Sequence, residues 1–190
     1  NMRKFRLATE VDAGAIAAIY APYVMTPITF DTEAPTASDF ARRIRETEEI
    51  YPYLVAEADG KIVGYAYAHR FRERAAYQWG AELSIYLVRD YHRRGTGRAL
   101  YEALLKILKR QGFRMAYGCI TVPNPASVAL HEKLGFRPVG VLRSAGWKGG
   151  AWHDVMWLER RLGAGTGAPT PIVPIGEIGV SDILDAYRED

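Results

Sequence analysis

The sequence predicts an α/β protein of one domain, in which a mixed, twisted sheet carries helices on both faces. Three observations indicate this class. Short apolar runs of strand character alternate with amphipathic runs of helical period. Asp59-Gly60 joins two strand-like runs as a hairpin turn. A third strand-like run ends in a glycine turn that leads directly into a long amphipathic helix. With 190 residues, 48% of them hydrophobic, the chain is long enough for one sizeable core.

The first half of the chain predicts two helices and three strands. Thr9 is a favourable N-cap for the first helix, and Pro22 ends it because proline cannot continue the helical hydrogen bonds. The second helix is charged and buries Phe40 and Ile44, which are four residues apart. The expected elements, in order, are a strand at 4–7, a helix that begins near residue 12, an irregular segment at 25–35, a helix at 38–49, and strands at 53–56 and 61–70.

The second half predicts two more helices and four more strands. Gly112 stands where a helix C-terminal glycine belongs, and Asn124-Pro125 places a cap residue before a proline at the first helical position. The expected elements are an arginine-rich loop at 71–78, a strand at 81–88, a helix at 98–111, a strand at 115–121, a helix at 124–134, and strands at 136–142 and 154–160 with a loop between them.

The composition changes at Gly163 to glycine, alanine, threonine and proline. We therefore expect a domain at 1–162 and a tail at 163–190. The tail should be extended and without a core of its own over 163–174, with a short helix at 181–187.

Charge and cysteine content limit the possible partners and compartment. A net charge of +3 is too small to indicate a nucleic acid partner. The basic clusters at 70–74 and 89–98 indicate local anion sites or a solvated surface. Cys119 is the only cysteine, which excludes a disulfide within the chain and favours a cytoplasmic location. Its apolar neighbours favour a place in the core. The sequence has no signal-peptide pattern and no apolar run of membrane length, so we expect no membrane partner.

The glycine turn carries the first functional indication. The strand at 83–88 leads through His92-Arg93-Arg94-Gly95-Thr96-Gly97 into the following helix. The first N–H groups of a helix lack intrahelical partners and favour an anion, and the glycines allow close approach of the backbone. No P-loop string occurs, and Leu100 stands where a dinucleotide fingerprint needs its third glycine. The turn alone therefore predicts a phosphate or pyrophosphate site, or an ordinary turn with a solvated basic rim.

The turn resembles the acetyl-CoA-binding motif of the GNAT N-acetyltransferases, Gln/Arg-x-x-Gly-x-Gly/Ala, with His92 at the first position. Nearly the whole chain resembles the phosphinothricin N-acetyltransferases within that superfamily. This resemblance implies a mixed, mostly antiparallel sheet, acetyl-CoA as co-substrate and no metal. The strings that carry it are Tyr51–Glu57, Ala75–Glu82, Val122–Asn124, His131–Phe136, and Ala145–Lys148 with Trp152–Val155.

The resemblance implies direct attack of a substrate amine on the thioester of acetyl-CoA. Glu82 matches the catalytic glutamate of the family and would remove a proton from the amine, through water. His131 matches a position that is also His in the phosphinothricin group, and an imidazole can serve as base or acid. Position alone would also fit a surface glutamate at a strand end and a histidine that is simply packed.

The resemblance further implies which residues bind the two substrates. The acceptor would be an amino acid with a phosphinate, sulfoximine or sulfone end, which cations would bind. A backbone N–H of the strand at 85–87 would bind the oxyanion. The implied acetyl-CoA contacts are Ile85, Tyr86, Leu87, Arg93, Arg94, Gly95, Thr96, Gly97, Arg98, Asn124 and Ser127. The implied acceptor contacts are Phe30, Arg72, Arg74, Tyr77, Tyr86 and Val155.

Two alternatives stay open at this point. Thr29 stands where the family commonly has Asn, and Arg72 where it commonly has Lys, so the acceptor could be another small amine or an ordinary amino acid. A catalytically silent acyl-CoA-binding module would share the same turn. The resemblance also implies a homodimer, with the last strands and the tail as candidate contacts.

Overall fold

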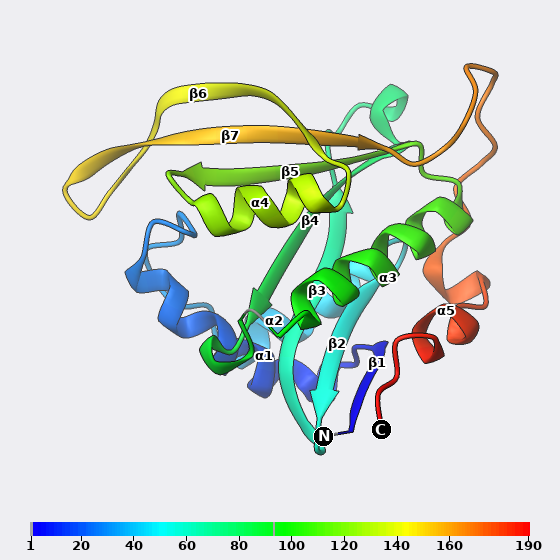
Figure 1. Cartoon of the computed structure of the whole chain (residues 1–190), viewed down its shortest axis with the longest axis horizontal. Helices are drawn as coiled ribbons and strands as arrows, with labels where there is room; N and C mark the ends of the chain where they lie inside the picture. The colour runs from blue at the N-terminus through cyan, green and yellow to red at the C-terminus, as the bar shows by residue number, and fades with distance from the viewer. Residues whose placement is uncertain (1, 93) are drawn as a thin grey trace.

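The computed structural model describes residues 2–92 and 94–190 and contains one seven-stranded sheet in the order β1-β2-β3-β4-β5-β7-β6 (Figure 1). Only β4 and β5 run parallel to each other, and all other neighbours are antiparallel. The predicted mixed sheet is therefore confirmed. The strands are β1 (Arg3–Leu7), β2 (Tyr53–Ala58), β3 (Lys61–Arg70), β4 (Gly80–Leu87), β5 (Met115–Val122), β6 (Arg137–Lys148) and β7 (Ala151–Arg161).

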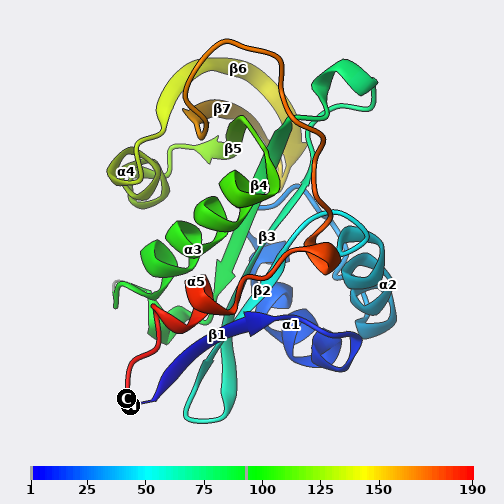
Figure 2. The ribbon, with the colours of Figure 1, turned by 90° about the vertical axis from the view of Figure 1, so that its right-hand side faces the viewer.

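Helices cover both faces of the sheet, as the sequence predicts. The view along the sheet shows α1 (Ala13–Tyr20) and α2 (Ala37–Thr47) on one face (Figure 2). The other face carries α3 (Thr96–Gln111), α4 (Pro125–Lys133) and α5 (Ser181–Asp185). Pro22 lies in a 3-10 turn, Ala21–Met25, which continues directly from α1. The chain therefore stays helical beyond the proline, because the turn needs no hydrogen bond from that position.

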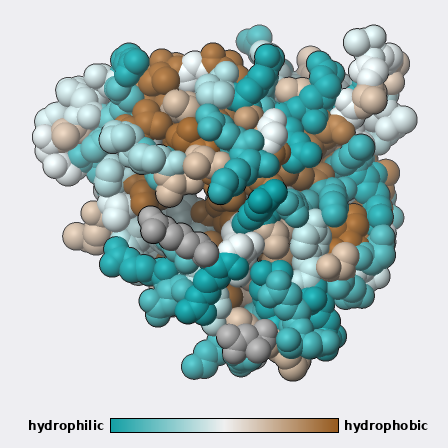
Figure 3. Space-filling model, viewed as in Figure 1, coloured by the Kyte–Doolittle hydropathy of each residue, from teal (hydrophilic) through white to brown (hydrophobic). Residues whose placement is uncertain are grey.

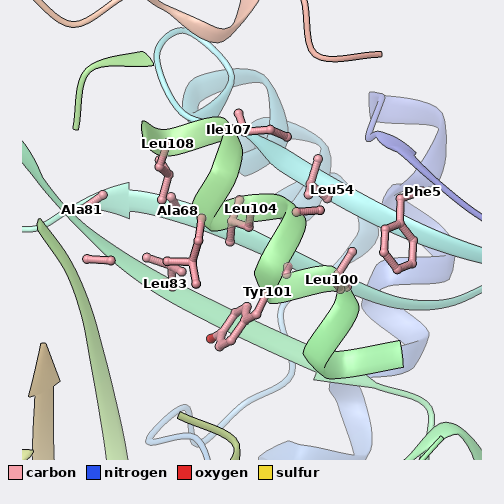
Figure 4. Close-up of a cluster of buried hydrophobic side chains, with 14 of the residues drawn as sticks. Phe5, Leu54, Ala68, Ala81, Leu83, Leu100, Tyr101, Leu104, Ile107 and Leu108 are labelled. Atoms are coloured by element: carbon pink, nitrogen blue, oxygen red, sulfur yellow. The ribbon is translucent and has the colours of Figure 1, made fainter. Parts of the chain in front are cut away.

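The sheet separates two hydrophobic cores, because successive side chains of a strand point to opposite faces. On the α3 face the apolar stripe of α3 packs on small and branched residues of the central strands (Figure 4). Members of this core include Leu54, Ala66, Ala68, Leu83, Leu100, Leu104, Ile107 and Leu108. On the other face the core is rich in tyrosine, and it includes Ile16, Phe40, Ile44, Tyr53, Val55 and Tyr65.

The last two strands are longer than the sequence analysis expects. The stretch expected as a loop between 142 and 154 forms the distal half of the β6–β7 hairpin. Gly149 and Gly150 form its tip with φ of 62° and 78°, which suits a two-residue hairpin turn. The register shifts between Leu142 and Gly146, where Ser144 has φ 48°. This bulge lets the strand continue through the irregular sequence that suggested a loop.

The tail packs on the domain and contributes to the same core. Ile175, Val180, Ile183 and Leu184 are buried in the core of the α3 face. The buried side chain of Gln111 donates to the carbonyl oxygens of two residues, Ile50 at 2.8 Å and Val173 at 3.0 Å. The backbones of Arg3 and Glu189 pair, so the two ends of the described chain lie together.

Candidate active site

The glycine turn places free N–H groups at the start of α3. Gly95 has φ 79°, a left-handed conformation that glycine adopts without strain, and the helix begins at Thr96. The first helical hydrogen bond runs from the N–H of Ala99 to the carbonyl of Gly95. The N–H groups of 96–98 therefore have no intrahelical acceptor and can bind an anion.

The cationic side chains at this turn differ in their contacts. The guanidinium of Arg94 lies over the ring of Tyr91, 4.8 Å from its centroid. Arg98 donates to Glu102 at 3.2 Å, one turn along the helix. Arg93, the third predicted cation, lies outside the described residues. Thr96 is buried, and a Cβ on Gly97 would lie 3.1 Å from Leu87 Cδ1, so the helix start packs closely on the end of β4.

His92 contacts Tyr23, which lies on the 3-10 turn Ala21–Met25 that follows α1. The Tyr23 hydroxyl donates to the carbonyl of Leu87 and lies 2.9 Å from His92 Nε2. Because the hydroxyl has one proton, His92 Nε2 must donate in this arrangement. His92 therefore ties the turn to the end of β4 through Tyr23.

An opening separates β4 from β5 beyond their first residues. The two strands pair only from Gly80 to Glu82 on β4 and from Met115 to Tyr117 on β5. The space-filling view shows a hollow with apolar side chains in it, between α3 and α4 (Figure 3). The backbone of β4 beyond Glu82 is therefore not paired with β5.

The ladder between β3 and β4 decides which backbone groups face this opening. Val88 donates to the carbonyl of Val63 at 2.8 Å, and alternate residues of an antiparallel strand bond to the same neighbour. Ser84 and Tyr86 therefore bond to β3, whereas the N–H groups of Ile85 and Leu87 point toward β5. The backbone of Tyr86 is thus engaged with β3, and its contact with acetyl-CoA stays a prediction.

Asn124 starts α4 beside the opening. Its Oδ1 accepts from the N–H of Ser127 at 3.2 Å, which is an N-cap. The cap uses the amide oxygen, so the amide nitrogen stays available to a ligand. The predicted cap and the predicted ligand contact are therefore compatible.

His131 is buried on the α4 side of β5. It is 3% exposed, and its ring makes edge contacts with Tyr101 and Phe136. A Cβ on Gly118 would lie 2.8 Å from His131 Nε2, so only glycine leaves room for this ring. Burial lowers the pKa of His131 and favours the neutral form. Nδ1 lies 2.7 Å from the Ser127 carbonyl, which can only accept, so Nε2 carries the lone pair.

Glu82 lies on the opposite face of the sheet from His131. It is the last residue of β4 that pairs with β5, opposite Tyr117, and the next β5 residue, Gly118, faces His131. Its side chain is 21% exposed, and its Oε2 lies 3.4 Å from His69 Nε2. Glu82 and His131 thus flank the opening from two sides and are not paired with each other.

The aromatic residues of the predicted acceptor site lie on the Glu82 face. The ring of Tyr86 meets that of Tyr20 edge to face, with centroids 5.0 Å apart. Phe30 is 40% exposed and packs against Gly146 of β6 and His153 of β7. Val155 is buried on the same face, opposite Thr121.

The predicted basic residues lie at the other end of this face. The guanidinium of Arg72 stands over Phe71, 4.9 Å from the ring centroid, and 6.0 Å from that of Trp157. Tyr77 contacts Phe71 edge to face. Arg74 is exposed and begins the short turn that carries Tyr77. The arginine loop is thus anchored by aromatic stacking, and its charged groups reach solvent.

Several residues of this face were not predicted from the sequence. Lys148 Nζ donates to the carbonyls of Thr26 and Thr29 at 2.7 and 2.6 Å. Tyr20 hydrogen-bonds to Thr29 and Asp31. The Lys148 contacts join the irregular segment before α2 to the β6–β7 hairpin, and the Tyr20 contacts join it to the end of α1. No local pattern indicates them, because the partners are far apart in sequence.

Cys119 is exposed, and its predicted place in the core is wrong. It stands two residues beyond Tyr117 on β5, so it shares the face of Glu82. Packing around the thiol and the charge of Glu82 raise the pKa of Cys119 to about 11. The apolar neighbours that suggested a core position face the other side of the strand.

Residues 2–92 and 94–190 form the part of the chain that the structure describes. No group of three or more His, Cys, Asp and Glu side chains in this part of the chain could hold a metal ion. The helices described there are each too short or too polar to cross a membrane.

Comparisons with known proteins find similar sequences and structures. The family described as acetyltransferase (GNAT) domain matches residues 5–157. A phosphinothricin N-acetyltransferase of Streptomyces viridochromogenes is 38% identical over 92% of this chain and 96% of its own length. An L-methionine sulfoximine/L-methionine sulfone acetyltransferase of Pseudomonas paraeruginosa is 32% identical over 86% and 97%. The crystal structure of a Sinorhizobium meliloti phosphinothricin acetyltransferase with AcCoA superposes with a TM-score of 0.84, at 36% identity over 88% and 93% of the two chains.

Proposed function

Since this chain belongs to the GNAT family of acetyltransferases, we propose that it acetylates the α-amine of phosphinothricin or of methionine sulfoximine or sulfone. The names of two relatives and of one solved neighbour support this acceptor class. The observation that carries the proposal is the position of Glu82. Its partly exposed carboxylate stands where β4 leaves β5, at the edge of the opening that can admit an extended thioester.

The residues around the opening fit acetyl-CoA. The free N–H groups of 96–98 suit a pyrophosphate, and Arg94 adds positive charge. The unpaired backbone of β4 and the side chains of Asn124 and Ser127 suit the amide groups of the pantetheine arm. Acetyl-CoA supplies an activated acetyl group. The protein therefore needs only to orient the amine against the thioester and to remove protons from the amine.

Glu82 is the proposed general base. An α-amine is mostly protonated near neutral pH and must lose a proton before or during attack. The carboxylate can take that proton through one water. The N–H groups of Ile85 and Leu87, which point into the opening, are the candidate donors to the developing oxyanion.

His131 is proposed to serve as an acceptor of a proton or hydrogen bond. Its Nδ1 is held by the Ser127 carbonyl, and burial favours the neutral ring. A neutral imidazole with its lone pair on Nε2 can accept a proton but has none to donate from that atom. Of the two roles left open by the sequence, this geometry favours the base.

The acceptor is proposed to lie along the Glu82 face. Phe30, Tyr86 and Val155 form apolar and aromatic walls, and Tyr77 lies near the arginine loop. Arg72 and Arg74 would bind the anionic or tetrahedral end of the amino acid. The exposed charges of these arginines favour such a ligand over a polyamine, which like charge would repel.

A homodimer is proposed to form along β6, the edge strand of the sheet. Exposed apolar side chains on β6 and at the end of the β6–β7 hairpin support this contact, since such patches mark association surfaces. They are Val139, Leu142 and Trp147 of β6 and Trp152 of β7. Light scattering after size exclusion tests the proposal. We expect twice the mass of 21.3 kDa, and the single mass for Leu142→Lys.

The test of the activity is release of free thiol from acetyl-CoA with a panel of acceptors. The panel contains phosphinothricin, methionine sulfoximine, methionine sulfone, glutamate, methionine and spermidine. We expect turnover on the first three, and loss of turnover with retained acetyl-CoA binding in Glu82→Gln. Turnover only on ordinary amino acids or spermidine would reject the acceptor class. Binding of acetyl-CoA without turnover on any acceptor would identify a silent acyl-CoA-binding module.

A further inference from the structure

His69 and Glu82 form a cross-strand pair at the edge of the opening. They stand directly opposite each other in the β3–β4 ladder, and Glu82 is the last residue of β4 that pairs with β5. His69 Nε2 lies 3.4 Å from Glu82 Oε2. The side chain of His69 is 37% exposed and that of Glu82 is 21% exposed, so the imidazole lies nearer to solvent.

The contacts of His69 determine where its protons lie. Nδ1 is 3.2 Å from the carbonyl oxygen of Arg70, which can only accept, so Nδ1 carries a proton. At rest the neutral ring presents its Nε2 lone pair toward the carboxylate. When a proton reaches the pair, it lies either on Oε2, from which the carboxylic acid can donate to the neutral ring, or on Nε2, from which an imidazolium can donate to the carboxylate.

The other groups around the pair stay in one protonation state near neutrality. Burial raises the pKa of the nearby tyrosines, and that of Cys119 is about 11. The positive charge of Arg43 on α2 partly offsets the rise in the pKa of Tyr67, and this arginine stays charged near neutral pH. The titratable groups on the same face of the sheet as the pair include Tyr67 on β3 and Tyr117 and Cys119 on β5.

We propose that His69 is a relay that carries the proton of the acceptor amine from Glu82 to solvent. This rests on the proposed role of Glu82 as base. The ammonium group gives one proton to the Glu82 carboxylate through a water, and the carboxylic acid passes it to His69 Nε2. The imidazolium then releases it to bulk water, and Glu82 is ionised again. The second proton of the amine ends on the thiol of CoA, so one proton leaves through His69 in each turnover.

The experiment compares pH profiles of kcat/KM between pH 5.5 and 9. His69→Gln keeps a polar side chain on the exposed strand but cannot carry a proton. We expect kcat to fall about 10- to 100-fold, with an unchanged KM for acetyl-CoA and a changed dependence of kcat/KM on pH. His69→Ala should regain turnover when imidazole is added, and not when sodium chloride is added at equal ionic strength.

Two controls separate this proposal from its premise. Lys4→Gln removes another cross-strand ion pair, that of Lys4 with Glu57 at the opposite end of β3 from His69, and should leave the profile unchanged. If Glu82→Gln is slow while His69→Ala keeps the parent profile without any response to imidazole, the relay is wrong and the base assignment stands. If Glu82→Gln turns over at the parent rate, the base assignment fails and the relay fails with it.

Discussion

The ring of Phe30 lies directly on Gly146. A Cβ built on Gly146 would come within 2.4 Å of Phe30 Cε2, so the absence of a side chain on β6 determines where this ring can rest. Phe30 belongs to the irregular segment before α2, and Gly146 to the β6–β7 hairpin. One wall of the proposed acceptor site is thus positioned by a residue distant in sequence.

The first prediction concerns Gly146→Ala. The added methyl group would displace the Phe30 ring, because three ring carbons would lie within 2.9 Å of it. We expect the KM of the acceptor to rise several-fold while the KM of acetyl-CoA stays unchanged. Gly140→Ala is the matched control, since a Cβ on Gly140 of the same strand meets nothing within 4 Å. Equal kinetics for the two variants would contradict the role of Gly146.

The second prediction concerns Lys148. Its ammonium group holds the segment at 26–29 through two carbonyl oxygens, and hydrogen bonds of charged groups contribute about 1.5–3 kcal/mol each. We expect Lys148→Met to raise the acceptor KM roughly 10-fold and to speed proteolysis of this segment. Lys61→Met, on the exposed hairpin turn of β3, is the control. Unchanged cleavage and KM in Lys148→Met would show that the other contacts of the segment, those of Phe30 and Tyr20, hold it without Lys148.

The third prediction concerns Cys119, the single cysteine, so that any thiol label reports on this position. Its pKa of about 11 leaves little thiolate at pH 8, on the order of 10²-fold less than an ordinary thiol. We expect slow alkylation by iodoacetamide that accelerates with pH up to 11. The carboxamidomethyl group would then project from the Glu82 face and reduce turnover, and a bound acceptor should protect. Rapid alkylation at pH 7, measured by mass spectrometry, would contradict the raised pKa.

The fourth prediction is a pH dependence of stability. Burial of its carboxyl group, with a smaller effect from Asp12, raises the pKa of Glu48 to about 7, and Oε1 has no hydrogen-bond partner. The folded state therefore binds this proton more tightly than the unfolded chain, so the parent loses stability as the pH rises from about 4.5 through 7. Glu48→Gln removes this loss.

Thermal unfolding checks this prediction. We expect the melting temperature of Glu48→Gln to exceed that of the parent by about 2–4 °C at pH 8 and to equal it at pH 5. Glu49→Gln changes an exposed neighbour and should follow the parent at both values. A difference that is the same at pH 5 and pH 8 would reject the titration of Glu48 as its cause.

Most of the fold could be predicted from local sequence. Strands and helices with a clear period, a cap such as Asn124, or a turn such as Asp59-Gly60 lie where the patterns predict them. The distal half of the β6–β7 hairpin could not, because its glycines and bulge look like those of a loop. Beyond the bulge, β6 and β7 pair again from Gly146 to Lys148. This pairing depends on contacts across the two strands, and a local sequence pattern does not indicate it.

The candidate site was predictable only where a motif carries it. The glycine turn and Glu82 are recognisable from their neighbours in the chain. His69 is not, because an isolated histidine in a strand has many uses, and only the β3–β4 register brings it to Glu82. The same register explains the mistake at Cys119. A strand buried on one face leaves the other face open, and neighbouring apolar residues do not say which face a given side chain takes.

Alternate residues of β4 have different roles in the proposed site, and this separates substitutions that affect the acceptor from those that affect acetyl-CoA. In the proposed site its odd-numbered residues, Ile85 and Leu87, would offer backbone groups to the thioester, and any amino acid except proline carries those groups. Its even-numbered residues, Ser84 and Tyr86, would offer side chains to the acceptor, since they lie on the Glu82 face. Substitutions at the even positions can therefore explore new acceptors while the donor stays bound as before. A library confined to those positions is a route to altered acceptor choice with an intact donor site.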